Sequence, residues 1–138
     1  MKNKARGFTL IEIMVVVVII AILAGIAIPS YNSQLRKGRR ADAQSFLMDL
    51  AQRQQQYLLD ARTYALDPGA VATLGTAVPT TVADWYTITV TPAAPTVPPT
   101  FIITATPIAG KDQVKDGFLE VKSNGAKRRN VSSTDYPW

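Results

Sequence analysis

The chain opens with a long run of apolar residues, and this run dominates its hydrophobic pattern. Every residue from Ile13 to Ile28 is apolar, and Glu12 is the one charged residue between Phe8 and Pro29. An α-helix over Phe8 to Pro29 would be about 30 Å long, close to the thickness of the hydrocarbon core of a bilayer. The pattern therefore predicts a helix that can span a membrane.

Beyond Pro29 the apolar pattern becomes periodic. Apolar residues recur at steps of three and four positions and form one stripe, which consists of Ala43, Phe46, Leu47, Leu50, Tyr57, Leu58 and Ala61. This period is typical of an amphipathic helix that packs one face on a core. We expect one long helix from about Phe8 to about Ala61, with a membrane-spanning half (residues 8–30) and an amphipathic half (residues 31–61). Gly25 and Pro29 predict a kink, because proline removes a backbone hydrogen bond and glycine loosens a helix.

The rest of the chain alternates like β-strands after a loop. Residues 62–84 are rich in Ala, Thr, Gly and Pro and predict a loop. Three segments then have strand-like composition, residues 85–90, 101–106 and 118–122, and Asn124-Gly125 is a strong hairpin signal before a short fourth strand at residues 126–131. We expect the sheet within residues 85–131 and a C-terminal loop at residues 132–138.

Three or four antiparallel strands cannot bury their apolar face alone. The apolar stripe on the second half of the helix is the obvious cover for that face. The predicted fold class is therefore α+β, with a long kinked N-terminal helix packed on a small antiparallel sheet of three to four strands.

The amino-acid composition excludes several classes of catalytic chemistry. The chain has 138 residues, no cysteine and no histidine, which excludes thiol catalysis, disulfides and imidazole chemistry. It also has no phosphate-binding glycine loop, no nucleophile elbow and no paired-carboxylate site. We expect no catalytic residue, no cofactor and no metal site. The chain is not expected to be an enzyme.

Two interpretations of the N-terminus compete on residues alone. A cleaved signal peptide needs a basic start, an apolar stretch and a small-x-small cleavage site, and Gly25-Ile26-Ala27 fits that site. Against it, the apolar run is longer than usual and contains Glu12. A carboxylate within a membrane span costs a few kcal/mol on insertion scales. This cost suggests that Glu12 has a partner, as it would in an anchored helix.

The segment Gly7-Phe8-Thr9-Leu10-Ile11-Glu12 resembles the processing site and helix start of type IV pilins and pseudopilins. A short leader with Lys2, Lys4 and Arg6 precedes it, as in that family. The resemblance implies that residues 1–7 are a prepilin leader, that a prepilin peptidase cuts between Gly7 and Phe8, and that the Phe8 amine is methylated. It also implies that Glu12 neutralises the N-terminal amine of Phe8 in a neighbouring subunit during assembly.

The physical chemistry of Glu12 agrees with this role. A carboxylate in the first turn is favoured by the free N–H groups and by the helix dipole. In hydrocarbon an unpaired charge is costly, so an amine from an adjacent helix is a strong partner. We therefore expect Glu12 to set the register between subunits.

The resemblance also implies a location and partners. The subunit would sit in the bacterial inner membrane with its leader in the cytoplasm and its domain in the periplasm, and would then move into an extracellular pilus. Its expected partners are other pilin subunits in a helical filament, the prepilin peptidase, the inner-membrane assembly platform and membrane lipid. Basic residues flank the span on both sides, Arg36–Arg40 among them, so charge alone does not decide the orientation.

Further positions are similar to PilE-type minor pilins, including Arg40-Ala41-Asp42-Ala43, Tyr64 and the closing Trp138. The resemblance also implies that a stretch around Gly25 and Pro29 loses helical order in the filament. Family members usually close the C-terminal loop with a disulfide, whose cysteines would fall near Asp116 and Pro137. We expect instead that Asp116 pairs with Lys127 or Arg129, and that Tyr136 and Trp138 pack on the domain.

The sequence also raises three weaker binding hypotheses: DNA, acidic lipid and calcium. Lys127, Arg128 and Arg129, close to Tyr136 and Trp138, could contact DNA, and the Arg36–Arg40 cluster could contact acidic lipid headgroups. Asp112 and Asp116 lack the dense spacing of a calcium loop. The preferred function is a subunit of a type IV pilus, a minor pilin acting in pilus assembly for motility, adhesion or DNA uptake. The alternatives are a type II secretion pseudopilin and a secreted soluble binding module with a cleaved signal peptide.

Overall fold

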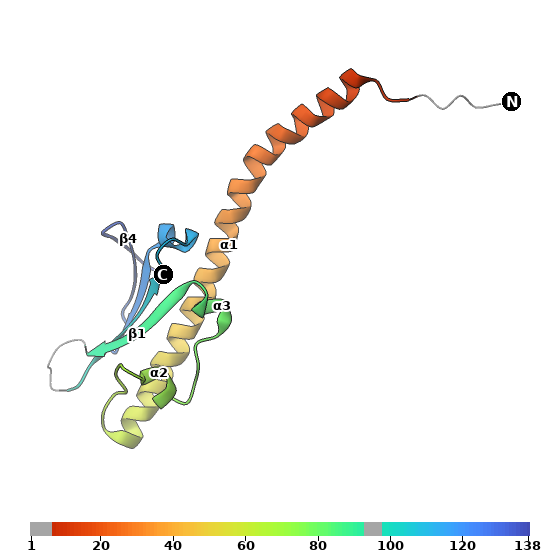
Figure 1. Ribbon diagram of the computed structural model, residues 1–138. Helices are drawn as coiled ribbons and strands as arrows, with labels where there is room; N and C mark the ends of the chain where they lie inside the picture. The colour runs from red at the N-terminus through yellow and green to blue at the C-terminus, as the bar shows by residue number, and fades with distance from the viewer. Residues whose placement is uncertain (1–6, 93–97) are drawn as a thin grey trace. The chain divides into compact units, whose positions relative to one another are not determined.

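The computed structural model describes residues 7–92 and 98–138. A single helix, α1 (Leu10–Ala61), occupies more than a third of the chain and contains Pro29 in its interior (Figure 1). The chain divides into two compact units at Leu35 and Arg36, and α1 contributes to both. The leader, expected at residues 1–7, lies outside the described residues apart from Gly7.

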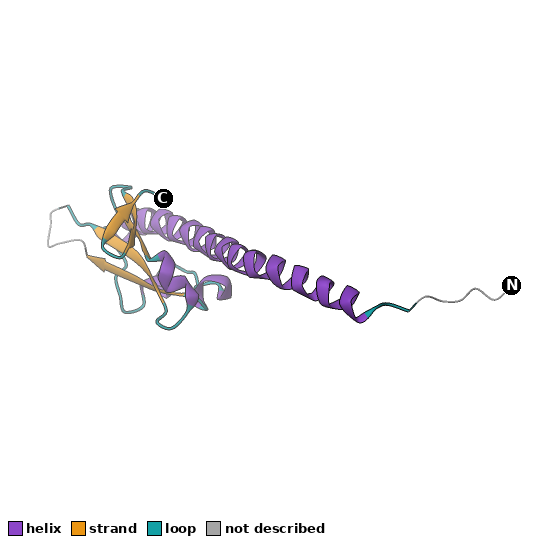
Figure 2. Cartoon of the chain, turned by 90° about the horizontal axis from the view of Figure 1, so that it is seen from above, coloured by secondary structure: helices purple, strands orange, loops and turns teal. Residues whose placement is uncertain are grey.

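The second unit contains a five-stranded sheet, which Figure 2 shows beside the second half of α1. Its strands are β1 (Tyr86–Pro92), β2 (Phe101–Pro107), β3 (Phe118–Lys122), β4 (Lys127–Val131) and β5 (Thr134–Tyr136). They lie in sequence order, and each neighbouring pair is antiparallel. A short 3₁₀ helix, η1 (Asp112–Asp116), joins β2 to β3.

One face of the sheet packs against α1 and forms the core. The buried helix residues include Ala43, Leu47 and Leu50, each 0% exposed. On the sheet the inward residues alternate, as the period of a β-strand requires: Tyr86 and Val90 on β1, Phe101, Ile103 and Ala105 on β2, and Leu119 and Val121 on β3. The helix stripe predicted from the sequence therefore covers the sheet.

The loop between α1 and β1 is held by specific polar contacts. It contains two short helices, α2 (Ala70–Thr73) and α3 (Thr80–Ala83). The buried amide of Gln54 on α1 clamps the loop at Ala65, accepting from its N–H at 3.0 Å and donating to its carbonyl at 2.5 Å. Asp67 continues this attachment: its N–H donates to the Val90 carbonyl and its carboxylate accepts from the Val90 N–H. The loop thus covers the outer edge of β1.

The predicted fold class, a long helix packed on a small antiparallel sheet, is confirmed. The sheet has five strands rather than three or four, because residues 134–136 form β5 where a C-terminal loop was expected. This strand is only three residues long and Pro137 follows it directly. Such a short segment gives little alternation to detect, so local sequence pattern could not reveal it.

Candidate functional site

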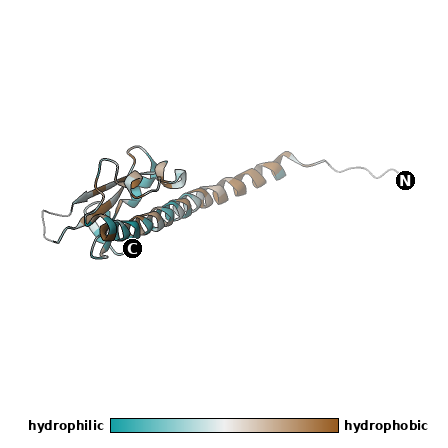
Figure 3. Cartoon of the chain, turned by 90° about the horizontal axis from the view of Figure 1, so that it is seen from below, coloured by the Kyte–Doolittle hydropathy of each residue, from teal (hydrophilic) through white to brown (hydrophobic). Residues whose placement is uncertain are grey.

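The first part of α1 is apolar and lies on the surface. Figure 3 shows this apolar stretch giving way to polar residues in the second half of the helix. Its large side chains are at least 46% exposed, and Phe8, which precedes the helix, is 79% exposed. By length and composition α1 could cross a membrane, and none of its apolar window is buried within the described protein. No other part of the described chain covers this surface.

Glu12 lies in the first turn of α1. Its backbone N–H faces the Thr9 hydroxyl at 3.3 Å, so Thr9 supplies a side-chain cap at the start of the helix. Among the described residues no cation pairs with the Glu12 carboxylate. The carboxylate is therefore available to a cation from outside the described part of the chain. Its role in assembly stays a prediction, as do cleavage at Gly7 and methylation of Phe8.

Gly25 and Pro29 lie within the unbroken helix α1. Their spacing of four residues matters, because Pro29 has no N–H to donate to the carbonyl of Gly25. The first half of α1 thus contains one carbonyl without its helical partner. This is a built-in weak point, and whether the helix kinks or loses order there stays a prediction.

A cluster of polar side chains ties α1 to η1 and β4. Asp116, only 11% exposed at its side chain, accepts from Arg40 at 2.7 Å and from Arg129 at 2.9 Å. Asp112 pairs with Arg36 and with Lys115, each at 2.6 Å. Its hydrogen bonds to Lys115 and then Arg36 lower the pKa of Asp112 to about 2. Both carboxylates are occupied by cations, and no group of three or more potential metal ligands occurs in the described residues.

Gln113 is the buried centre of this cluster. Its amide donates to the Arg36 carbonyl, to the Tyr86 hydroxyl at 2.7 Å and to Asp116 at 3.3 Å. Burial raises the pKa of Tyr86 to about 12, and the Gln113 hydrogen bond opposes this shift. The Asp116–Arg129 pair was predicted from sequence, whereas Arg40 and Gln113 were not. The contacts of Arg40 and Gln113 form only when η1 packs against α1. This contact joins residues far apart in sequence, so a local sequence pattern cannot predict it.

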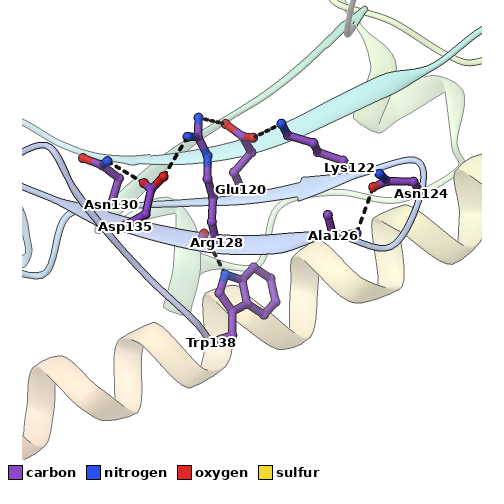
Figure 4. Close-up of polar contacts among 8 residues, drawn as sticks. All are labelled: Glu120, Lys122, Asn124, Ala126, Arg128, Asn130, Asp135 and Trp138. Carbon is purple, nitrogen blue, oxygen red and sulfur yellow. Dashed lines mark hydrogen bonds and ion pairs between the residues drawn. The ribbon is translucent and has the colours of Figure 1, made fainter.

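The three basic residues of the predicted DNA contact do not form one free patch. Arg128 lies on the sheet face away from α1, between Glu120 at 2.9 Å and Asp135 at 3.3 Å (Figure 4). The hydrogen bond to Glu120 holds the pKa of the Arg128 guanidinium above its ordinary value. The hydrogen bond from the Asn130 amide lowers the pKa of Asp135, and the charge of Arg128 lowers it further. Arg129 faces Asp116 on the other side of the sheet. Only Lys127 among the three has no carboxylate partner within the described residues.

Of the two C-terminal aromatic residues, Trp138 packs against the core as expected, whereas Tyr136 stays 42% exposed. The Trp138 ring lies between β4 and α1 in Figure 4, and its indole N–H donates to the Arg128 carbonyl at 2.8 Å. The Lys127 ammonium lies 5.7 Å from the centroid of that ring, and the Arg129 guanidinium lies 5.0 Å from the Tyr136 ring. Cation–π contacts and the Asp116 pairs thus occupy the region where the family's disulfide was expected.

A shallow apolar groove of about 170 Å³ runs between α1 and the ends of β2 and β3, with Lys127 on its rim. Its floor includes Ala51, Phe101 and Val121. A wider hollow of about 570 Å³ adjoins it near Arg62, Tyr64 and Asn124. Sequence analysis did not predict these hollows, because they depend on how the hairpin at Gly125 lies beside the helix.

Comparisons with known proteins match residues 2–117 to two family models. Residues 2–28 match the prokaryotic N-terminal methylation motif, and residues 29–117 match the family described as "Type IV minor pilin ComP, DNA uptake sequence receptor". No solved structure matches the chain.

Curated relatives include proteins named as components of type IV pili or fimbriae. The chain is 36% identical over 73 residues to the type IV wide pilus major component PilA4 of Thermus thermophilus, which covers 53% of this chain and 56% of that protein. It is 45% identical over 60 residues to the type IV major fimbrial protein FimA of Dichelobacter nodosus, covering 44% of this chain and 38% of FimA. A match to prepilin peptidase-dependent protein D of Escherichia coli is 60% identical over 40 residues, 29% of this chain and 27% of that protein. The chain therefore spans about half or less of the length of these relatives.

Proposed function

This chain belongs to the family of type IV minor pilins, and we propose from that premise that it is a minor subunit of a type IV pilus, acting through assembly rather than catalysis. The observation that carries the proposal is the first half of α1, whose apolar side chains are exposed over the whole stretch from Leu10 to Ile28 apart from the half-buried Ala24. Large exposed apolar surfaces mark protein or membrane contacts. A bilayer would cover this surface before assembly, and helices of other subunits would cover it in the filament.

In this proposal prepilin peptidase removes residues 1–7 and leaves Phe8 as the methylated N-terminus. The Glu12 carboxylate then attracts the N-terminal amine of a neighbouring subunit, since it has no cation partner in the described residues. The inner-membrane assembly platform would extract the subunit from the inner membrane, with the domain on the periplasmic side. The domain, which buries its own core, would be displayed outside the filament.

A matched pair of variants tests the role of Glu12. Glu12→Gln removes the charge in the first turn. Asp42→Asn makes the same change at an exposed carboxylate further along α1 that forms no ion pair within the described residues. The measurement is the amount of chain in the sheared filament fraction relative to the membrane fraction. We expect Glu12→Gln to lower that ratio at least tenfold and Asp42→Asn to leave it unchanged. Equal incorporation of both variants would contradict the proposal.

A second candidate function is DNA binding by the assembled subunit. The description of the matching family favours it, since that family is named for a receptor of DNA uptake sequences. The support from the structure is Lys127, which lies beside the Trp138 ring and pairs with no carboxylate in the described residues. Cations that neutralise phosphates and rings that stack on bases are the usual elements of such surfaces.

The DNA hypothesis can be tested by fluorescence anisotropy with a labelled duplex and the full chain in detergent. Lys127→Ala should weaken binding about fivefold at low salt and reduce the salt dependence by about one counterion. Lys122→Ala removes a lysine that faces Glu120 at 3.6 Å; it serves as the charge-matched control and should weaken binding less. If both variants bind like the unmodified chain, Lys127 does not contact DNA.

A further inference from the structure

The charges of this chain are unevenly distributed, and half of the cations after Gly7 lie in two short segments of the second unit. Two short segments hold six cations against two carboxylates: Arg36, Lys37, Arg39 and Arg40 on α1, and Lys111, Asp112, Lys115 and Asp116 around η1. We call these eight residues the basic collar, whose net charge is +4. The other residues after Gly7 hold six cations and eight carboxylates and sum to −2.

The folded structure brings the two segments of the collar together. Asp112 and Asp116 bond to Arg36 and Arg40, and the Gln113 amide donates to the Arg36 carbonyl. Trp85 joins them from a third side: its ring stacks under Arg39 at 3.4 Å and lies 5.1 Å from the Lys111 ammonium. Lys37 is exposed and pairs with no carboxylate among the described residues, and Lys115 is 72% exposed at its side chain, so both charges are open to solvent. Even if the nearby Asp42 and Asp84 are counted, the region stays positive at +2.

The collar also presents an apolar residue. Val114 is 50% exposed and lies on η1 between Lys111 and Lys115. Arginine and lysine bind anionic phosphates, while a valine between them can enter the boundary between headgroups and acyl chains. This combination of exposed cations around an exposed aliphatic side chain is typical of a surface that rests on a charged bilayer.

The covalent structure of α1 keeps the collar near the membrane segment. Arg36 lies eight positions after Ile28, the last residue of the apolar run, which corresponds to about 12 Å along the helix. The headgroup region adds several ångströms to each side of the hydrocarbon core, and charges act over about 8 Å at physiological ionic strength. Because the helix between Ile28 and Arg36 is this short, the charges of the collar can interact with the headgroups at any tilt of the helix.

We propose that the basic collar, with Val114 at its centre, docks on anionic phospholipid headgroups while the subunit is anchored in the bilayer. The lipid would hold the domain against the membrane surface before extraction, and release of this contact would accompany entry into the filament. The proposal rests on the membrane anchoring of α1 proposed above. It adds a lipid-binding surface formed by the folded domain itself.

The absence of cysteine permits a site-specific test in the full chain. Val114→Cys places a fluorescent NBD label in the collar, and Ser133→Cys places the same label at an exposed turn between β4 and β5. Both proteins are reconstituted into vesicles of phosphatidylcholine alone or with 30% phosphatidylglycerol, containing a lipid with a nitroxide on its headgroup. We expect the nitroxide to quench the label at residue 114 at least threefold more in the anionic vesicles, with no lipid dependence at residue 133.

Charge reversal separates the collar from nonspecific attraction. In the Val114→Cys background, Lys37→Glu with Lys115→Glu should abolish the extra quenching in anionic vesicles, and 0.5 M NaCl should reduce it strongly. Vesicle flotation reports anchoring independently. Protein that floats with both vesicle types but shows equal quenching at residue 114 would overturn the collar proposal and leave anchoring intact. Protein that does not float would overturn the anchoring on which it rests.

Discussion

The two halves of α1 are covered in different ways. In the first half, residues such as Ile19 and Leu23 are 51% and 61% exposed, although the sequence there is almost entirely apolar. In the second half, Leu47 and Leu50 are fully buried under the sheet, while exposed positions hold charged and polar residues. Within the described residues, the same helix therefore has one half that is covered by its own domain and one half that is not.

This difference predicts where substitutions act. Burying a large aliphatic side chain contributes about 1.5–3 kcal/mol, but in the first half that gain comes only with lipid or neighbouring helices. Changes there should affect anchoring and assembly while leaving the domain's unfolding unchanged. Changes in the second half and the sheet should alter unfolding directly. Unfolding of the full chain in detergent tests this separation. Tryptophan fluorescence follows the unfolding of the domain, because Trp85 and Trp138 both lie there.

The largest effect is expected from Gly117→Ala. Gly117 has φ 76°, and a Cβ there would lie 1.9 Å from the Asn130 carbonyl oxygen on β4. Backbone strain and the clash together should cost more than about 3 kcal/mol, because β4 would have to move. Urea denaturation measures the loss.

Two glycine controls sharpen that result. Gly75 also has positive φ, 67°, but an added Cβ would meet open space, so Gly75→Ala should cost only about 1 kcal/mol. Gly25→Ala lies in the exposed half of α1 and should leave the urea midpoint of the domain unchanged. A large shift from Gly25→Ala would contradict the separation of the two halves.

Gln54→Ala should be the next most disruptive change. It leaves the buried N–H and carbonyl of Ala65 without their partners, at about 2–3 kcal/mol. Gln52→Ala removes an exposed amide from the same helix and should change stability by less than about 0.5 kcal/mol. Similar urea midpoints for the two variants would show that the Gln54 clamp does not stabilise the loop.

Asp116→Asn should destabilise the domain by about 2 kcal/mol, since it removes the charge that Arg40 and Arg129 share. The matched change Asp112→Asn affects a more exposed pair and should cost less. Thermal unfolding at neutral pH compares the two. Equal losses of stability would mean that sharing Asp116 between two arginines stabilises the domain no more than the pairs of Asp112 do.

The smallest effect is a dependence on acid. The pKa of Asp112 is about 2 in the folded chain and 3.8 without its partners. A lowered folded pKa gives stability that is present above pH 3.8 and is lost as the pH falls toward 2. Asp112→Asn should remove this contribution, so its unfolding midpoint should vary less than that of the unmodified chain between pH 4 and pH 2. If both proteins showed the same pH profile, Lys115 and Arg36 would not stabilise the charged form of Asp112.

The elements set by local pattern were predictable from sequence. The apolar run, the stripe around Leu47 and Leu50, and the alternation of three strands each follow from a repeat that can be read over a few residues. Gln54 and Gln113 were missed because their partners, Ala65 and Tyr86, come from other segments. A buried glutamine looks like any polar helix residue until the path of the chain is known.

The basic cluster at residues 127–129 shows a second limit of prediction from sequence. Its three residues are adjacent in sequence, but successive side chains of a strand point to opposite faces. Arg128 therefore joins Glu120 on the outer face, while Arg129 reaches Asp116 on the helix side. Alternation in the predicted strand at residues 126–131 could have revealed this split. The acidic partners could not be identified, because they depend on the register with β3 and on η1.

The central claim is that the first half of α1 remains on the mature chain and is completed by other molecules. The most direct test is the intact mass and N-terminal residue of the protein from native membranes and sheared filaments. The account predicts a chain that begins at methylated Phe8 and retains Glu12. A chain that begins at Ile28, after cleavage behind Ala27, would show that the apolar half is discarded and would contradict the account.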